Sequence, residues 1–206
     1  MTARASRAES AAIGLRAHSG WAALVAVVGP VASPAVVARR RIDLAGPDIP
    51  KQPYHAAENL SLAKAEELLA RCVAGSRRLA SEGVSETLSA LRRDGRSVSA
   101  CALLLASGRK LPELSAVLAS HALIHTADGE HFRDALRHAA ARAKLPLAAI
   151  PEKEIWQRAA ARLGVPEDEL ARRVAALGRP LGPPWTRDQK LAALAAWTAL
   201  AESRRP

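Results

Sequence analysis

The sequence predicts an α/β protein in which a mixed β-sheet carries helices on both faces. Three observations support this: three short apolar runs open the chain, one nearly continuous apolar run lies in its middle, and Leu and Ala recur at helical spacing elsewhere. A meander of strands followed by alternating helices and strands is typical of a mixed sheet. The 206 residues suffice for one core, so we expect a single domain over residues 11–206 and a disordered terminus over residues 1–10.

Five strands are expected from the apolar runs. Gly, Ser and Pro separate the first three, as in an antiparallel meander. The fourth is apolar along nearly its whole length, which predicts a buried central strand. The expected ranges are 12–17, 21–28, 35–44, 98–105 and 147–150.

Helices fill most of the remaining chain. Thr186 and Gln189 have the spacing of a capping box, which marks the start of the last helix. Whether the longest helix is continuous through residues 126–129 stays open, because Asp128 beside Gly129 could instead cap a second helix there. The expected ranges are 57–81, 85–93, 112–144, 152–163, 167–177 and 187–202.

The charge of the chain favours a nucleic-acid partner only in part. Thirty basic and 20 acidic residues give a formal net charge of +10, which suits binding to phosphate. The excess is spread along the chain, however, and residues 111–150 hold four basic and four acidic groups. A GC-rich genome also produces an Arg- and Ala-rich composition, so a functional basic surface and composition bias both stay open.

Apolar runs and cysteines narrow the class of protein. No apolar run reaches the length of a membrane-spanning helix, so we expect no membrane partner. Cys72 and Cys101 are too few and too far apart for a zinc site with paired cysteines, and their apolar surroundings predict buried free thiols. The apolar run 21–28 followed by Val31-Ala32-Ser33 resembles a signal peptide, but the long polar lead and the break at Gly29-Pro30 count against export, so we expect a cytoplasmic protein.

Two stretches carry a resemblance to a known family. The segment IGLRAHSGWAALVAV, which ends at Val27, has a strand that ends in a turn with Gly and Ser before the next strand. From Glu130 through Ala201 the order is a long helix, a Leu-Pro-Leu strand, a Pro-Glu-x-Glu helix start, an amphipathic helix, a Pro-rich loop and an Ala/Leu-rich last helix. In pattern and order both stretches resemble RuvC-like resolvases. The resemblance implies a ribonuclease H-like fold and a DNA or RNA partner, with a dimer as one option for the oligomeric state.

The resemblance fails where that class of enzyme holds its metals. Such enzymes bind two divalent metals between acids on the first strand, the central strand and the last helix. Here the first-strand acid falls at Arg16, residues 98–105 contain no acid, and only Asp188 keeps its place. Either catalysis is lost or other residues act at the same place. The cofactor stays unknown, with a divalent metal as one option.

The longest expected helix supplies other polar candidates. At 100° per residue, His121, His125 and Asp128 fall within about 60° of one another on the apolar stripe, while Glu130 and His131 point to solvent. Polar groups on such a stripe form either an internal network or the lining of a site. Two imidazoles at i and i+4 could also bind one metal, with Asp128 as a third ligand.

Further candidates lie in turns and loops. His18, in the first turn, is expected near Asp188 or near the long helix. Tyr54 and His55 lie in a proline-rich stretch, as part of a lid or of a simple loop. Trp185 either stacks on a base or packs beside the last helix. We assign possible catalytic roles to His18, His121, His125, Asp128 and Asp188, and nucleic-acid binding to Arg109, Lys110, Arg187, Lys190 and Trp185.

These observations lead to one main functional hypothesis and two alternatives. The main one is a RuvC-like protein that binds nucleic acid and has a degenerate or altered active site. The first alternative is a hydrolase of a small molecule or nucleotide, with His121 as general base, Asp128 orienting it and His18 assisting. The second is a non-catalytic interaction module. The sequence leaves open whether the protein is an enzyme, and on which substrate.

Overall fold

A five-stranded mixed sheet forms the centre of the computed structural model, which describes residues 8–106 and 110–203. The strand order is β3-β2-β1-β4-β5, with β1, β2 and β3 antiparallel and with β4 and β5 parallel to β1. The strands are β1 (Glu9–His18), β2 (Trp21–Val28), β3 (Ala35–Asp43), β4 (Arg96–Leu105) and β5 (Leu147–Pro151). The predicted meander and central strand are confirmed. Glu9 and Ser10, expected in a disordered terminus, belong to β1, while residues 1–7 lie outside the described part of the chain.

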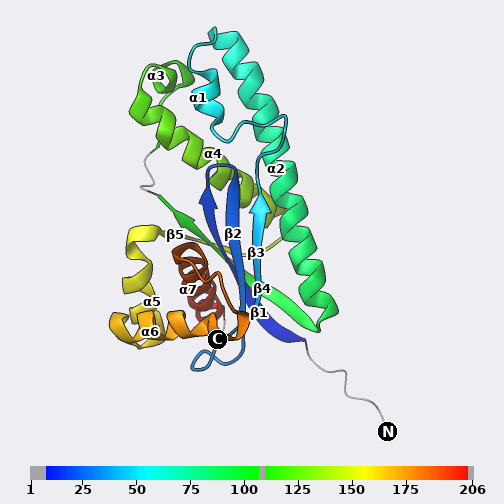
Figure 1. Ribbon diagram of the computed structural model, residues 1–206, viewed down its shortest axis with the longest axis vertical. Helices are drawn as coiled ribbons and strands as arrows, with labels where there is room; N and C mark the ends of the chain where they lie inside the picture. Colours follow the sequence, from blue (N-terminus) through cyan, green and yellow to red (C-terminus); the bar gives the residue numbers. More distant parts are fainter. Residues whose placement is uncertain (1–7, 107–109, 204–206) are drawn as a thin grey trace.

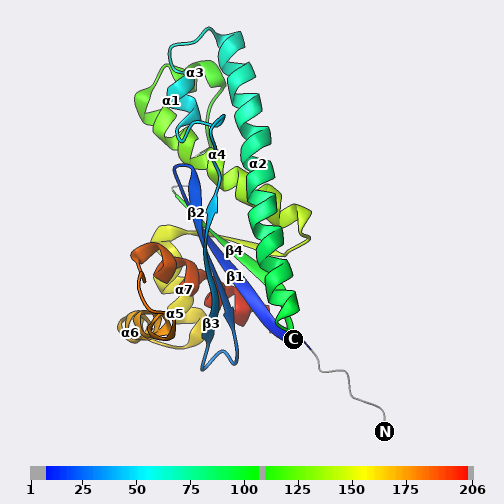
Figure 2. The ribbon, with the colours of Figure 1, turned by 45° about the vertical axis from the view of Figure 1, so that its right-hand side comes forward.

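Helices cover both faces of this sheet, as Figures 1 and 2 show. On one face lie α2 (Leu62–Arg93) and α4 (His121–Arg142), and on the other α5 (Ile155–Leu163), α6 (Glu167–Leu177) and α7 (Arg187–Glu202). Two short helices, α1 (Pro53–Ala57) and α3 (Leu114–Leu118), lie beyond the end of the sheet. Single 3-10 turns precede α5, as η1 (Glu152–Glu154), and follow α6, as η2 (Arg179–Leu181).

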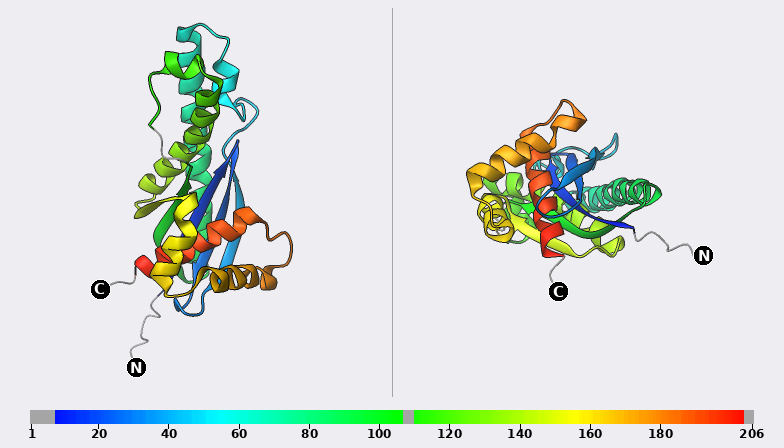
Figure 3. Two further views of the ribbon diagram at one scale, coloured as in Figure 1. Left: turned by 90° about the vertical axis from the view of Figure 1, so that its left-hand side faces the viewer. Right: turned by 90° about the horizontal axis from the view of Figure 1, so that it is seen from below.

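The side chains of β1 alternate between the two faces of the sheet, so every second residue faces α7. Ile13 and Leu15 pack in the core under α2 and α4, whereas Gly14 faces α7 so closely that a Cβ there would lie 1.9 Å from the carbonyl oxygen of Ala192. With a side-chain period of two, Arg16 and His18 share the face of Gly14. The carboxyl end of β1 therefore presents polar residues to the start of α7, and Figure 3 shows α7 lying across the sheet.

One long helix replaces the two that were expected over residues 57–81 and 85–93. Helix α2 runs without a break from Leu62 to Arg93 and includes Gly83. A Cβ at Gly83 would lie only 2.6 Å from Cγ2 of Ile42 on β3. This glycine therefore permits close packing between helix and strand, which is a different role from ending the helix.

The expected helix over residues 112–144 is divided, but at a different point from the one left open. The break falls at Ala119 and Ser120, where Ser120 takes an extended backbone conformation at the N-cap position of α4. Helix α4 then continues through residues 126–129, so Asp128 lies inside it and does not begin a second helix there.

The buried face of α4 differs from the predicted stripe. Ile124, Asp128 and His131 are buried, whereas His121 and His125 are exposed. The prediction was wrong for both exposed histidines, because the first turns of α4 lie beyond the end of the sheet, next to α1 and α3 (Figures 1 and 2). It was also wrong for His131, which lies against Ser76 of α2. The predicted stripe also included Leu114 and Leu118, which are the first and last residues of a separate helix, α3.

Two further expectations concern cysteines and membranes. Cys72 and Cys101 are free and buried, as predicted. Burial raises the pKa of the Cys101 thiol to about 12, which keeps it protonated at neutral pH. Among the described helices, none combines the length and the apolar character needed to cross a membrane.

Changing Gly14 to Ala should destabilise the fold. The new methyl group would collide with the backbone of α7 at Ala192, and overpacking of this kind costs about 1–3 kcal/mol or more. Urea denaturation would measure the loss. Gly46→Ala is the matched control, because nothing lies within 4 Å of a Cβ there, and it should shift stability by no more than about 0.5 kcal/mol. Equal stabilities of the two variants would contradict the close approach.

His131 should make the fold less stable in mild acid. Ser76 Oγ donates to the carbonyl of Leu44 at 2.7 Å, so it must accept from His131 Nε2 at 3.0 Å, and burial lowers the pKa of His131 below 6.5 although Asp128 and Asp134 oppose this. Above pH 6.5 its contribution to stability is fully present, and it declines as the pH falls below 6.5 because the unfolded chain then binds the proton more readily. Unfolding free energies at pH 5.5 and 7.5 should therefore differ more for the wild type than for His131→Gln. Parallel pH dependences would contradict this role.

Candidate functional site

An arginine joins two carboxylates at the carboxyl end of β1. Arg16 donates from Nε and Nη2 to the two carboxylate oxygens of Glu152, at 2.9 and 3.0 Å, and from Nη1 to Oδ1 of Asp188 at 2.5 Å. The three side chains are 15%, 28% and 23% exposed, so the contacts are largely shielded from solvent. We call Arg16, His18, Glu152 and Asp188 the Arg16 cluster. It connects β1 to the starts of η1 and α7.

His18 completes this cluster, in one of the two places expected for it. Its Nε2 lies 2.5 Å from Nη1 of Arg16 and 3.0 Å from Oδ1 of Asp188. Nε2 thus lies beside a donor, the Arg16 guanidinium, and beside an acceptor, the Asp188 carboxylate, and its own hydrogen-bond role depends on the tautomer. The imidazole also stacks on Trp21 with 4.3 Å between ring centroids, and the Arg41 guanidinium lies 4.4 Å from the centroid of the same indole.

The central strand supplies no acid to this cluster. Arg16 pairs in register with Leu104 of β4, and Leu104 is buried in the apolar core beneath α7. Within the described chain, the carboxylates of the Arg16 cluster are Glu152 and Asp188, and both already bind the Arg16 guanidinium. Divalent metals of the magnesium type need several oxygen ligands around one ion. These residues therefore do not fit the two-metal centre that the family resemblance implies.

A second polar cluster lies where α1 meets α4. His55 of α1 and His121 and His125 of α4 form it, and we call it the three-histidine cluster. Nε2 of His121 and Nε2 of His125 are 3.1 Å apart. The ring centroids of His55 lie 5.3 and 4.5 Å from those of His121 and His125, in edge-to-face geometry.

Asp128 supports this second cluster from behind. Its Oδ2 lies 2.5 Å from Nδ1 of His55, and its Oδ1 accepts from the backbone N–H of Tyr54 at 2.7 Å. The carboxylate is almost fully buried, so these contacts satisfy a group that would otherwise be costly to bury. Asp128 thus contacts His55 and not His121, in contrast to the role predicted for it. His18 belongs to the Arg16 cluster, so the three proposed members of a hydrolase site are divided between two places.

The expected nucleic-acid-binding residues are only partly gathered. Arg187 is 79% exposed and its Nη2 lies 3.4 Å from Oε1 of Glu152, at the rim of the Arg16 cluster. Lys190 is half-buried nearly one turn further along α7, and Lys110 is exposed. Arg109 lies outside the described residues.

Trp185 packs instead of presenting its ring to a ligand. Its Nε1 donates to the carbonyl of Val174 at 2.9 Å. The indole lies against Gly178, where a Cβ would be 2.2 Å from Cγ of Trp185. Of the two readings of Trp185, packing is the one that the structure shows.

Sequence reasoning missed Glu152, and it placed His55 in a lid or a simple loop, whereas His55 lies in α1. Glu152 directly follows β5, and the carboxyl ends of parallel strands share one edge of a sheet, so its position carried a usable signal. His55 gave no comparable signal, because its partners lie about 70 residues away in the chain.

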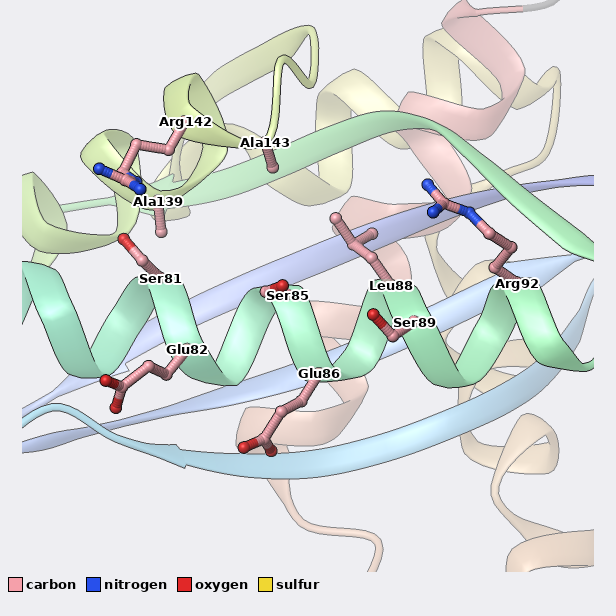
Figure 4. Close-up of a pocket in the computed structure, with 10 residues that line it drawn as sticks. All are labelled: Ser81, Glu82, Ser85, Glu86, Leu88, Ser89, Arg92, Ala139, Arg142 and Ala143. Carbon is pink, nitrogen blue, oxygen red and sulfur yellow. The ribbon is translucent and has the colours of Figure 1, made fainter.

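A hollow between α2 and the end of α4 is separate from both clusters. Figure 4 shows that serines and charged side chains of α2, together with Arg142 of α4, line much of it. Its polar residues include Ser81, Glu82, Ser85, Glu86, Ser89, Arg92 and Arg142. None of the residues that line it belongs to the Arg16 cluster or to the three-histidine cluster.

Comparison with known proteins identifies the fold. No family model and no curated protein matches the sequence. Among solved structures, Thermus thermophilus RuvC in complex with a Holliday junction substrate matches with a TM-score of 0.54 and 18% identity, over 95% of each chain. Another structure of Thermus thermophilus RuvC matches with a TM-score of 0.52 and 17% identity, over 94% of this chain and 95% of that one. Over nearly its whole length, the chain has the ribonuclease H-like fold seen in RuvC.

Proposed function

We propose that this protein binds nucleic acid through a RuvC-like fold and does not hydrolyse phosphodiesters by the two-metal route. The observation that carries this proposal is the position of Arg16. Its guanidinium lies between Glu152 and Asp188, two acids at the carboxyl edge of the sheet. A fixed organic cation therefore occupies the place where carboxylates would otherwise attract metal ions.

The Arg16 guanidinium neutralises these carboxylates in place of a metal ion and stays charged. A guanidinium stays protonated in proteins and matches a carboxylate with two parallel hydrogen bonds, as it does at Glu152. To admit metals, the side chain would have to leave two shielded carboxylates and break all three of its bonds to them. The apolar Leu104 would still deny the site an acid from the central strand. This combination supports a degenerate active site.

Fold and surface charge together support nucleic-acid binding. One of the structures with this fold is Thermus thermophilus RuvC in complex with a Holliday junction substrate, and the match spans 95% of this chain. Exposed cations stand around the Arg16 cluster: Arg187 and Lys153 are each 79% exposed and Arg41 is 54% exposed. Cations of this kind bind phosphate and release counterions from the nucleic acid.

The alternative of a hydrolase that uses His121 as general base receives less support. Such a base needs an orienting partner on its second nitrogen. The carboxylate assigned to that role, Asp128, contacts His55. His18, which was to assist, contacts Asp188 and Trp21.

Binding to a branched DNA should weaken steeply as salt increases. Arg187→Ala should lower affinity and reduce the slope of log K against log salt by about 1, because one phosphate contact is lost. Fluorescence anisotropy between 50 and 300 mM NaCl would measure both effects. Arg172→Ala is the matched control: this arginine is also exposed and paired with carboxylates, but it lies on α6, and its loss should leave the slope unchanged. Binding that does not depend on salt would contradict the proposal.

Removing Arg16 should destabilise the fold and create a cation site. Arg16→Ala removes the guanidinium that neutralises two partly shielded carboxylates and leaves Glu152 only the exposed Arg187 and Asp188 only His18, which should cost about 1–3 kcal/mol. Mn²⁺ should then raise the melting temperature of this variant but not that of the wild type. Arg41→Ala, which breaks an exposed pair with Asp43, should cost no more than about 1 kcal/mol and should gain no response to Mn²⁺. Metal-dependent cleavage of DNA by the wild type, abolished in Asp188→Asn, would overturn the degenerate site.

A further inference from the structure

We propose that the three-histidine cluster is a binding site for one zinc ion, with His55, His121 and His125 as ligands. The site is distinct from the Arg16 cluster and does not depend on nucleic-acid binding. One nitrogen from each ring lies within 4.8 Å of the other two. Around zinc, tetrahedral geometry with bonds of about 2.0–2.1 Å places ligand nitrogens about 3.4 Å apart. The 3.1 Å between Nε2 of His121 and Nε2 of His125 is already close to that separation.

Asp128 fixes the tautomer that a zinc ligand needs. The carboxylate lies 2.5 Å from Nδ1 of His55, so Nδ1 carries the proton and Nε2 keeps a free electron pair. Metal-binding histidines commonly donate their second N–H to a carboxylate in this way, which sets the ring orientation and makes the ligand nitrogen more basic. The backbone N–H of Tyr54 holds the same carboxylate in place. Asp128, predicted as a third metal ligand, therefore does not bind the metal itself but orients the ligand His55.

Glu58 stands in a related position beside His121. Its Oε1 lies 4.0 Å from Nδ1 of His121, while Nε2 of that ring faces His125. The separation is longer than a hydrogen bond. Two of the three rings thus have a carboxylate on the side of Nδ1, and Nε2 of His121 faces the other α4 histidine of the cluster.

The donor set selects the kind of metal. Imidazole nitrogens suit zinc and its neighbours among the transition metals, whereas magnesium and calcium prefer oxygen ligands. Three protein ligands leave a fourth position for water, and His121 and His125 are exposed, so solvent reaches the site. A zinc ion here would link α1 to α4 at the end of the molecule that projects beyond the sheet (Figure 1).

Cobalt(II) provides a direct test on the full chain, purified without a histidine tag and stripped with a chelator. Wild-type protein should bind one Co²⁺ per chain, with the intense visible absorption of four-coordinate cobalt, and one equivalent of Zn²⁺ should displace it. The double variant His121→Ala/His125→Ala should lose this spectrum. Both side chains are exposed, so the variant should remain folded, which circular dichroism would check. Asp128→Asn should bind about 10–100-fold more weakly.

A matched histidine variant and a stability measurement complete the test. His138→Ala removes another histidine of α4 that is outside the cluster, and it should bind Co²⁺ as the wild type does. Zinc at a hundredfold excess over its Kd should raise the melting temperature of the wild type by about 5–10 °C and leave the double variant unchanged. The site is refuted by the absence of saturable binding to the wild type, by the weak spectrum of six-coordinate cobalt, or by binding that survives in the double variant.

Discussion

The close approach of α7 to β1 determines where the polar groups of the sheet edge meet. Gly14 leaves room for the backbone of α7 at Ala192. Arg16 lies two residues after Gly14 on the strand, and Asp188 lies four residues before Ala192 on the helix. These separations are about 6.8 Å along a strand and about 6.0 Å along a helix, so the two side chains lie at nearly the same distance from the contact. The glycine thus brings the guanidinium and the carboxylate together, although neither residue touches it.

Arg16 makes the neutralisation of these acids permanent. Carboxylates shielded from solvent need a positive partner, which can be an exchangeable metal ion or a covalently attached guanidinium. In this chain the partner is attached, and it contacts Glu152 and Asp188 at once. The same contacts tie β1 to η1, which follows β5, and to the first turn of α7. Arg16, at the position of a catalytic acid in sequence order, therefore connects three parts of the fold. Its removal should lower the stability of the fold more directly than it lowers the affinity for nucleic acid.

The sequence predicted those elements whose signals are local. The meander strands, the apolar β4 and the capping box of α7 each depend on residues close together in the chain, and the structure contains all of them. Errors arose where tertiary packing overrides a local signal. Residues 82–84 were expected to separate two helices, but Gly83 lies inside α2 and packs against Ile42. His131 was assigned to solvent because its neighbours on α2 and the carbonyl of Leu44 could not be anticipated from α4 alone.

The two polar clusters differ in how far the sequence could predict them. The Arg16 cluster follows from topology, because the carboxyl ends of β1, β4 and β5 share one edge, and the contact between His18 and Asp188 was one of the two expected. The three-histidine cluster needs His55, and Asp128 holds it against α4 by binding both its ring and the backbone of Tyr54. The described apolar clusters around α1 and α3 are small, each with three fully buried residues. A polar anchor from Asp128, and a zinc ion where one binds, would therefore hold this end of the molecule, where burial of apolar surface contributes less than in the sheet.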